Sequence, residues 1–353
     1  MTTTFVIFLI VIIKANTLIA QAPVVQLPNG LIQGREGATI KSKTYYAFEK
    51  IPYATPPVGE LRFKAPLPAQ NWEGTLNTTY LDVSCHQLLP ALAQELESED
   101  CLYVNVFTPQ LPSAEQNVSF PVMFFIHGGA FAGGSSAMHK SDLIVENDVV
   151  LVTINYRLGP FGFLSTQDEV IPGNNGLKDQ QLAIQWTHDN IHLFGGDPEK
   201  VTIFGQSAGS ASCAYQLLNQ QSQGLFIGAI LESGVSIMPS VYQRRAREIA
   251  FAAAAFINDT FTNSNDSAAL LDFLLTVDAE DIKDAARQYS AAETGPEDEE
   301  LSRGLYWGPV IEVKNPDAFI TKKMFGLLQA GNVVAVPILI GVTSEEGLGL
   351  YPR

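Results

Sequence analysis

The chain has 353 residues, of which 46% are hydrophobic and 16% are charged, and 37 acidic against 21 basic side chains give a formal net charge of −16 at pH 7. This apolar content is sufficient for a large core and excludes a disordered or low-complexity protein. The sequence contains no basic stripe or Arg-rich run, so the charge pattern gives no support for a nucleic-acid partner.

The N-terminal segment has the pattern of a secretory signal. Residues 5–13 are nine uninterrupted apolar residues, and Lys14 then begins a stretch of small and polar residues. Nine residues are too few to cross a bilayer but suit the apolar part of a signal peptide. We expect a signal peptide over residues 1–20, with cleavage open between Ala20 and Ala22 and an uncleaved anchor as the alternative. The remaining chain, residues 21–353, is then expected to be a secreted, extracellular domain without a membrane span.

Cysteines and glycosylation sequons agree with export. Cys85 and Cys101 lie sixteen residues apart and can close a small loop, which leaves Cys213 over. Such a disulfide stabilises a protein by about 3 kcal/mol through its effect on the unfolded chain. Sequons of the form Asn-x-Ser/Thr predict N-glycosylation at four positions: Asn77, Asn117, Asn258 and Asn265.

The predicted elements begin with a hairpin and continue as an alternation of strands and helices. Residues 24–27 and 31–34 flank an Asn-Gly pair, which is typical of a hairpin. A strand is expected at residues 102–107, and residues 241–289 have a helical pattern. Further strands are expected at 122–126, 149–154, 201–204, 227–231 and 338–340, with helices at 182–191 and 208–218. Continuous apolar strands that alternate with helices predict an α/β fold with a mostly parallel sheet and helices on both faces.

A candidate nucleophile lies between the strand at 201–204 and the helix at 208–218. Residues 205–209 read Gly-Gln-Ser-Ala-Gly, the G-x-S-x-G pattern of a sharp strand-to-helix turn that exposes a serine hydroxyl. The backbone N–H of Ala208, at the helix start, is then available to a developing oxyanion. The pattern thus indicates acyl transfer by Ser207, with a glycine-rich turn carrying an idle serine as the alternative.

The loop after residue 126 supplies a second oxyanion candidate. Residues 127–131 read His-Gly-Gly-Ala-Phe, and small residues here let two backbone N–H groups approach a substrate oxygen. A phosphate-binding loop is the competing interpretation. It is disfavoured because the Lys-Ser/Thr ending of a P-loop and the spacing of a dinucleotide fingerprint are both absent.

The ordered motifs resemble the type-B carboxylesterase and cholinesterase family of the α/β-hydrolase fold. The matching segments run from about residue 24 to the end of the chain: FEKIPYA at 48–54, LRF at 61–63, EDCLYVNV at 99–106, HGGAF at 127–131, NYRLG at 155–159, GFL at 162–164, GLKDQ at 176–180, FGGDP at 194–198, GQSAG at 205–209 and GVTSEEG at 341–347.

This resemblance implies a serine esterase that acts on a small-molecule carboxylic ester without cofactor or metal. It makes Ser207 the nucleophile and Glu346 the triad acid, with Ser233 orienting Glu346 and the adjacent Glu345 as the alternative acid. It also implies an oxyanion hole from Gly129, Ala130 and Ala208, a disulfide between Cys85 and Cys101, and structural ion pairs Arg62–Glu99 and Arg157–Asp197.

The base of the triad is the part of the pattern that the sequence lacks. The fold's chain order is Ser, then Asp or Glu, then His, but only seven residues follow Glu346 and none is histidine. The five histidines all precede Ser207. We therefore expect a C-terminally truncated family member with little or no activity of its own, because a serine without its base is a poor nucleophile.

Three alternatives concern substrate, activity and metal. Gln206 and the absence of tryptophan from the Cys85–Cys101 loop disfavour choline esters. Gly-Gln-Ser-Ala-Gly, with Arg62-Phe63 and Asp179-Gln180, resembles juvenile hormone esterases, which act on an apolar methyl ester; a non-catalytic ester-binding or adhesion-type homologue is the other alternative. His188 and His192 have the spacing of a helical zinc pair, but no third ligand is evident, so we expect no metal.

Overall fold

The computed structural model describes residues 22–89, 95–138, 140–293 and 305–346. The predicted signal peptide lies outside the described residues. Within these ranges, no helix has both the length and the apolar character needed to cross a membrane.

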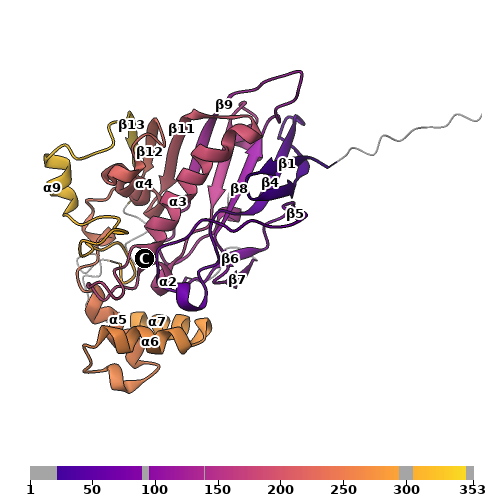
Figure 1. Cartoon of the computed structure of the whole chain (residues 1–353). Coiled ribbons are helices and arrows are strands. Elements are labelled where there is room, and N and C mark those ends of the chain that lie inside the picture. Colours follow the sequence, from indigo (N-terminus) through magenta and orange to yellow (C-terminus); the bar gives the residue numbers. More distant parts are fainter. Residues whose placement is uncertain (1–21, 90–94, 139, 294–304, 347–353) are drawn as a thin grey trace, which may run out of the picture.

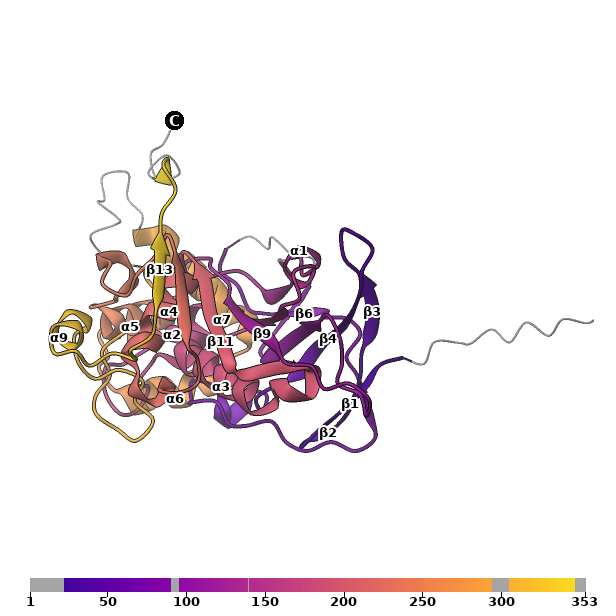
Figure 2. The same cartoon turned by 90° about the horizontal axis from the view of Figure 1, so that it is seen from above.

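The described residues form a central sheet of eight strands (Figure 1). From one edge to the other the strands are β13 (Ile338–Gly341), β12 (Gly228–Glu232), β11 (Gly196–Gln206), β9 (Phe120–Ile126), β10 (Val150–Ile154), β8 (Tyr103–Thr108), β4 (Thr44–Pro52) and β3 (Arg35–Ala38). Figure 2 shows β13 and β3 far apart, with the other strands of the sheet between them.

The sheet has a parallel and an antiparallel part. Strands β13, β12, β11, β9 and β10 are mutually parallel, whereas β8, β4 and β3 continue the sheet in antiparallel fashion. The mostly parallel sheet expected from the sequence is therefore confirmed. The antiparallel edge is an addition that the strand–helix alternation did not predict.

Helices cover the two faces of this sheet unequally. Helices α3 (Asn175–Asn190) and α4 (Ala208–Leu218) pack on β11 on the side of the main core. The opposite face carries a smaller apolar cluster that includes Phe125, Val145 and Leu151, and Val145 belongs to the short helix α1 (Asp142–Val145). Alternate residues of β10 point to these two clusters, as the period of two of a strand requires.

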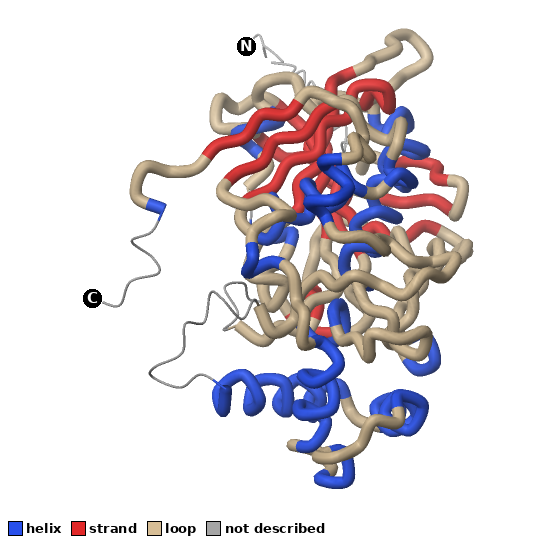
Figure 3. The backbone as a smooth tube through the Cα atoms, turned by 90° about the vertical axis from the view of Figure 1, so that its left-hand side faces the viewer, coloured by secondary structure: helices blue, strands red, loops and turns tan. Residues whose placement is uncertain are grey.

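A helical layer lies at one end of the sheet. It consists of α5 (Ala246–Ala255), α6 (Ser267–Thr276) and α7 (Ala279–Glu293), and Figure 3 shows these helices below the strands. Helix α7 contacts the buried helix α2 (Gly159–Phe163), which follows the end of β10. Helix α9 (Met324–Gln329) packs beside α4. The helical pattern predicted for residues 241–289 is confirmed.

Small elements at the N-terminal side complete the described fold. The expected hairpin is present as β1 (Val24–Leu27) and β2 (Gly30–Gln33), with β5 (Thr75–Asn77) beside β2. Strands β6 (Val83–Cys85) and β7 (Leu96–Ser98) pair in parallel. A disulfide joins Cys85, at the end of β6, to Cys101. Cys213 is a buried free thiol.

Candidate active site

Ser207 occupies a strained turn between β11 and α4. Its φ of 56° and ψ of −121° lie in a region that non-glycine residues rarely adopt. Two backbone hydrogen bonds hold the turn: the Ser207 N–H donates to the carbonyl of Glu232 at 2.8 Å, and the Ser207 carbonyl accepts from the N–H of Ala211 at 2.9 Å. The side chain remains partly exposed. The fold therefore presents a serine at the carboxyl end of β11, where active sites of open α/β sheets lie.

Glycine at positions 205 and 209 is required by the close approach of neighbouring backbone. A Cβ on Gly209 would lie 2.1 Å from the carbonyl oxygen of Ile126, and a Cβ on Gly205 would lie 2.6 Å from the carbonyl carbon of Gly209. Real Cβ atoms do not tolerate such distances. The two glycines thus let α4 begin directly against the end of β9.

The loop after β9 lies beside Ser207. A Cβ built on Gly128 would be 3.3 Å from the Cβ of Ser207 and 2.5 Å from the carbonyl oxygen of Gln206. Next along the loop, Gly129, Ala130 and Phe131 have φ values of 111°, 56° and 56°. This turn brings the N–H groups of Ala132 and Gly133 onto the Gly129 carbonyl, both at 2.9 Å.

In the described part of the chain, three backbone N–H groups near Ser207 are available to a ligand. Among the described residues, none accepts a hydrogen bond from the N–H of Gly129 or Ala130. Ala208 is the first residue of α4, and its N–H precedes the first intrahelical bond of that helix, which Ala211 makes. Such donors can stabilise negative charge on an oxygen placed between the two loops.

Glu346 lies on the loop after β13 and is tied to the loop after β12. Its Oε2 accepts hydrogen bonds from the Ser233 hydroxyl at 3.0 Å, the Thr343 hydroxyl at 2.8 Å and the Thr343 N–H at 2.9 Å. These bonds, that of the Thr343 hydroxyl first, lower the pKa of Glu346, although its side chain is exposed. The sequence did not single out Thr343, and its signal is the three-residue spacing to Glu346 within the GVTSEEG motif.

A pocket of about 470 Å³ adjoins the loop after β9. Apolar and aromatic side chains form most of its wall, which is a composition typical of small-molecule sites. The lining residues are Leu88, Leu89, Ala130, Ala132, Arg287, Ser290, Ala291, Leu305, Tyr306 and Trp307. Ala130 belongs to both the pocket wall and the loop beside Ser207. Sequence reasoning missed the lining residues outside this loop because they come from three separate segments that share no motif.

The histidines in the described ranges lie in other surroundings. His127 contacts the carbonyl of Gly128 at 2.9 Å through Nδ1, and its ring stacks on Tyr156. His188 lies near Asp189, and His86 lies near two glutamates. Within the described part of the chain, no histidine ring forms a hydrogen bond or ion pair with Ser207 or Glu346. The site therefore contains a nucleophile candidate and an acid candidate, without an assigned base.

One of the two expected ion pairs is present and the other is wrong. Arg62 pairs with Glu99 at 2.6 Å. Arg157 pairs with Asp179 of α3, also at 2.6 Å, instead of with Asp197. The reason is the strand direction. Arg157 follows the carboxyl end of β10, whereas Asp197 lies at the amino end of the parallel strand β11, so the two residues are at opposite ends of the strands.

Asp197 has different partners near the surface. It pairs with Lys200 at 2.9 Å and accepts a hydrogen bond from the hydroxyl of Ser119 at 2.9 Å. Asp179, by contrast, is fully buried and accepts three hydrogen bonds from Arg157, one from its backbone N–H and two from its guanidinium. The adjacent Gln180 donates to the hydroxyl of Ser212. Asp179 and Gln180 thus have a structural role, because they form buried hydrogen bonds with neighbouring segments, and they are not among the residues that line the pocket.

A mostly parallel sheet with a serine on its strand-to-helix turn and a glycine-rich loop from the neighbouring strand defines an α/β hydrolase. The chain belongs to the carboxylesterase family, whose model matches residues 21–353. This confirms the resemblance seen in the sequence.

Two curated relatives illustrate the similarity. A carboxylic ester hydrolase of Bombus ignitus is 40% identical over 335 residues, which cover 93% of this chain and 57% of that protein. The juvenile hormone esterase of Tribolium castaneum is 38% identical over 336 residues, which cover 92% of this chain and 55% of that protein. The chain thus spans somewhat more than half the length of these relatives.

Two solved structures confirm the fold. The juvenile hormone esterase of Manduca sexta, with OTFP covalently attached, has a TM-score of 0.79 and 31% sequence identity to this chain. The aligned residues cover 90% of this chain and 59% of that esterase. A PNB esterase has a TM-score of 0.78 and 37% identity, with 94% of this chain and 66% of its own covered.

Proposed function

We propose that the protein is a carboxylic ester hydrolase that acts through an acyl-serine intermediate on Ser207. The observation that carries this proposal is the contact between the strained Ser207 turn and the loop at Gly128. The N–H groups of Gly129 and Ala130 flank this contact and donate to no other described residue. Glu346 is the proposed triad acid, and Ser233 is the residue that orients it.

In the proposed reaction, Ser207 Oγ attacks the ester carbonyl carbon while its proton passes to the base. The carbonyl oxygen gains negative charge and binds the N–H groups of Gly129, Ala130 and Ala208, an interaction whose removal typically costs 10²–10³ in kcat. The tetrahedral intermediate expels the alcohol, which takes up the proton, and water then hydrolyses the acyl-serine. The fold's chain order places the histidine base after Glu346, and we assign this role to none of the described histidines.

The pocket favours an uncharged ester with an apolar group. Leu88, Leu305 and Trp307 offer apolar surface, while the cationic Arg287 in the same wall repels a quaternary ammonium. This supports an apolar ester over a choline ester. The same wall makes a juvenile-hormone-like methyl ester the second candidate substrate, in line with the Tribolium castaneum and Manduca sexta esterases among the similar proteins.

Covalent labelling tests the proposed nucleophile. The natural gene product is treated with an organophosphate or with OTFP, and the modified peptide is identified by mass spectrometry. We expect one adduct on Ser207 that is absent in Ser207→Ala. The adduct is retained in the control Ser212→Ala, which alters a buried serine within the adjacent helix α4. An adduct that persists in Ser207→Ala contradicts the proposal.

Export and glycosylation form part of the same proposal. Asn77, Asn117 and Asn265 are exposed, and Asn258 is partly exposed. In two of these sequons, the threonine hydroxyl donates a hydrogen bond to Oδ1 of the asparagine two residues before it. Thr79 donates to Asn77 and Thr260 to Asn258, both at 2.8 Å. Glycosidase treatment of protein from the culture medium of an insect cell line tests this. A mass unchanged by the enzyme contradicts glycosylation.

A further inference from the structure

Three side chains of the types that can bind a metal converge where α7 packs against the disulfide loop. His86 follows the disulfide cysteine Cys85, Glu97 lies in β7, and Glu280 lies in the first turn of α7. One ligand atom from each lies within 4.8 Å of the other two. The cluster therefore joins two segments that are almost 200 residues apart in the sequence.

His86 points a polar atom with no hydrogen-bond partner into this cluster. Its side chain is 8% exposed, and among the described residues its buried Nδ1 has no hydrogen-bond partner. The nearest carboxylate oxygens are Glu280 Oε1 at 3.4 Å and Glu97 Oε2 at 3.6 Å. A buried polar atom left in this state is costly, so its presence requires an explanation.

The two separations from His86 Nδ1 match edges of a zinc coordination tetrahedron. Zinc binds histidine nitrogen and carboxylate oxygen at about 2.0–2.2 Å, so neighbouring ligand atoms in tetrahedral geometry lie roughly 3.3–3.6 Å apart. Both Nδ1-to-oxygen separations lie at or within this range. We propose that His86, Glu97 and Glu280 bind one Zn²⁺ ion, which links α7 to the Cys85–Cys101 loop, with water as the fourth ligand.

The surroundings prepare two of the ligands. The ring of His86 stacks on Phe161, with 5.1 Å between the two ring centroids, and this contact holds its orientation. Glu97 Oε2 accepts a hydrogen bond of 3.1 Å from the N–H of Gln87. Hydrogen bonds of this kind orient metal ligands and tune their affinity.

Lys283 competes with the metal. Its Nζ lies 2.9 Å from Glu97 Oε2 and 2.6 Å from Glu280 Oε2, and its side chain is 7% exposed. The ammonium group therefore neutralises the carboxylates when zinc is absent and must move aside when zinc binds. Zinc and the Lys283 ammonium group therefore compete for the same carboxylates. Removal of the ammonium group is expected to raise the affinity for zinc.

The site bears on the candidate pocket because the segments that it joins line that pocket. Leu88 and Leu89 follow His86 in the disulfide loop, whereas Arg287 and Ser290 lie on α7. Arg287 already donates hydrogen bonds to the carbonyls of Gln87 and Leu88. A bound zinc ion takes the place of the Lys283–Glu97 ion pair as a further link between these two walls.

Calorimetric titration of the tag-free chain with zinc chloride tests the proposal. We expect one Zn²⁺ per chain and a rise in Tm on binding. Zinc affinity falls at least about tenfold in His86→Ala and in the nearly isosteric Glu97→Gln, rises in Lys283→Met, and is unchanged in the control His188→Ala, whose imidazole also has acidic neighbours.

The variants separate loss of the site from loss of the fold. Circular dichroism without metal checks that Glu97→Gln folds. If His86→Ala is destabilised, the zinc affinity of Glu97→Gln therefore decides the result. Failure of the wild-type chain to bind zinc at micromolar free metal overturns the proposal. Equal affinity in wild type and Glu97→Gln, or unchanged affinity in Lys283→Met, also overturns it.

Discussion

The hydroxyl of Ser233 donates a hydrogen bond of 3.0 Å to Oε2 of Glu346 and thereby joins the loop after β12 to the loop after β13. The residue before Ser233 is Glu232, whose carbonyl accepts the N–H of Ser207. The end of β12 thus contacts the proposed nucleophile through its backbone and the proposed acid through a side chain. Parallel register explains this, since Gln206, Glu232 and Gly341 are aligned at the ends of their strands.

Ser233→Ala should raise the pKa of Glu346. One of the three hydrogen bonds to the carboxylate is lost, while the larger contribution of Thr343 remains. A bond to the charged form lowers a pKa, so its removal shifts the titration of Glu346 to higher pH. NMR titration of the side-chain carboxyl carbon, assigned with Glu346→Gln, measures the shift. Thr343→Ser, which keeps a hydroxyl, is the control, and an unchanged pKa in Ser233→Ala would show that the bond is absent in solution.

Gly128→Ala should damage both the loop beside Ser207 and the stability of the protein. The added methyl would lie 2.5 Å from the backbone oxygen of Gln206, so the two loops must separate. Overpacking of this kind costs about 1–3 kcal/mol, and urea unfolding measures it. Gly326→Ala in α9 is the matched control because its methyl meets nothing within 4 Å and alanine favours a helix. Equal stability of the two variants would contradict the close approach.

The sequence predicts secondary structure well in segments where apolar residues occupy the buried positions. The helix predicted at residues 208–218 has those bounds as α4, because a glycine turn precedes it and apolar residues fill it. Helix α3 begins at Asn175, well before the predicted residue 182. Its first turns bury Lys178 and Asp179 in ion pairs with Glu312 and Arg157, so charged residues occupy core positions and conceal the helical period.

Long-range partners were less predictable from the sequence. The family motifs identified Ser207, Glu346 and the glycine-rich loop as site candidates. Their positions relative to one another depend on the register of the parallel strands, which places the ends of these strands side by side. The pocket wall and the cluster around His86 depend on how α7 packs against the disulfide loop. No local pattern encodes that packing, and the wrong partner for Arg157 has the same origin.

Asp179→Asn should destabilise the protein strongly. The variant leaves the Arg157 guanidinium, which is 3% exposed, without its charged partner, and breaking a buried pair in this way costs about 3–5 kcal/mol. Asp197→Asn is the control, since a surface pair such as Asp197–Lys200 contributes about 0–1 kcal/mol. Urea unfolding at pH 7 compares the two variants. A larger loss in Asp197→Asn would restore the pairing that the sequence suggested.

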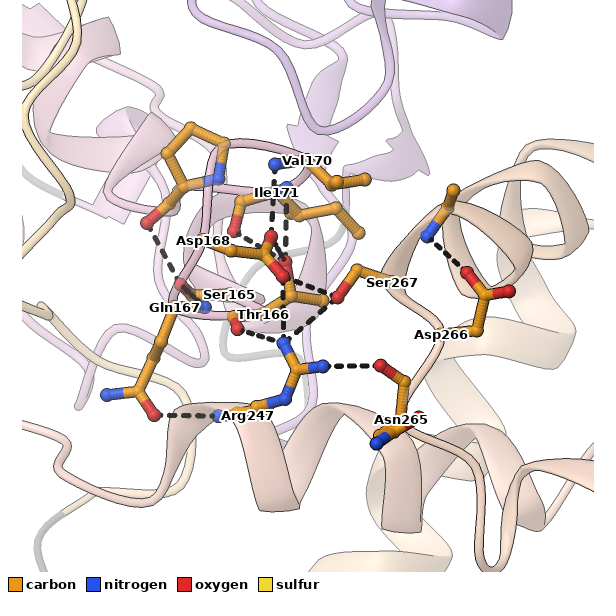
Figure 4. Close-up of polar contacts among 12 residues, drawn as sticks. Ser165, Thr166, Gln167, Asp168, Val170, Ile171, Arg247, Asn265, Asp266 and Ser267 are labelled. Carbon is orange, nitrogen blue, oxygen red and sulfur yellow. Dashed lines mark hydrogen bonds and ion pairs between the residues drawn. The ribbon is translucent and has the colours of Figure 1, made fainter.

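Asp168 should make stability depend on pH below about 4. Its carboxylate accepts hydrogen bonds from Thr166, Ser267, the N–H of Val170 and Arg247, which tie the loop after α2 to α5 and α6 (Figure 4). Burial acts to raise the pKa of Asp168, but these partners outweigh it and lower the pKa from 3.8 to about 2. The charged form is thus favoured in the folded state, and its stabilisation is present above pH 4 and lost as pH falls towards 2.

Asp168→Asn should therefore cost about 1 kcal/mol at pH 7, a modest amount because water screens this partly exposed carboxylate. The difference from wild type should shrink between pH 4 and pH 2, because wild-type Asp168 becomes protonated there. Urea unfolding over this pH range measures the difference, with Asp272→Asn on the exposed side of α6 as control. A difference that stays constant from pH 7 to pH 2 would mean that the asparagine acts through packing and that the charge of Asp168 does not stabilise the junction.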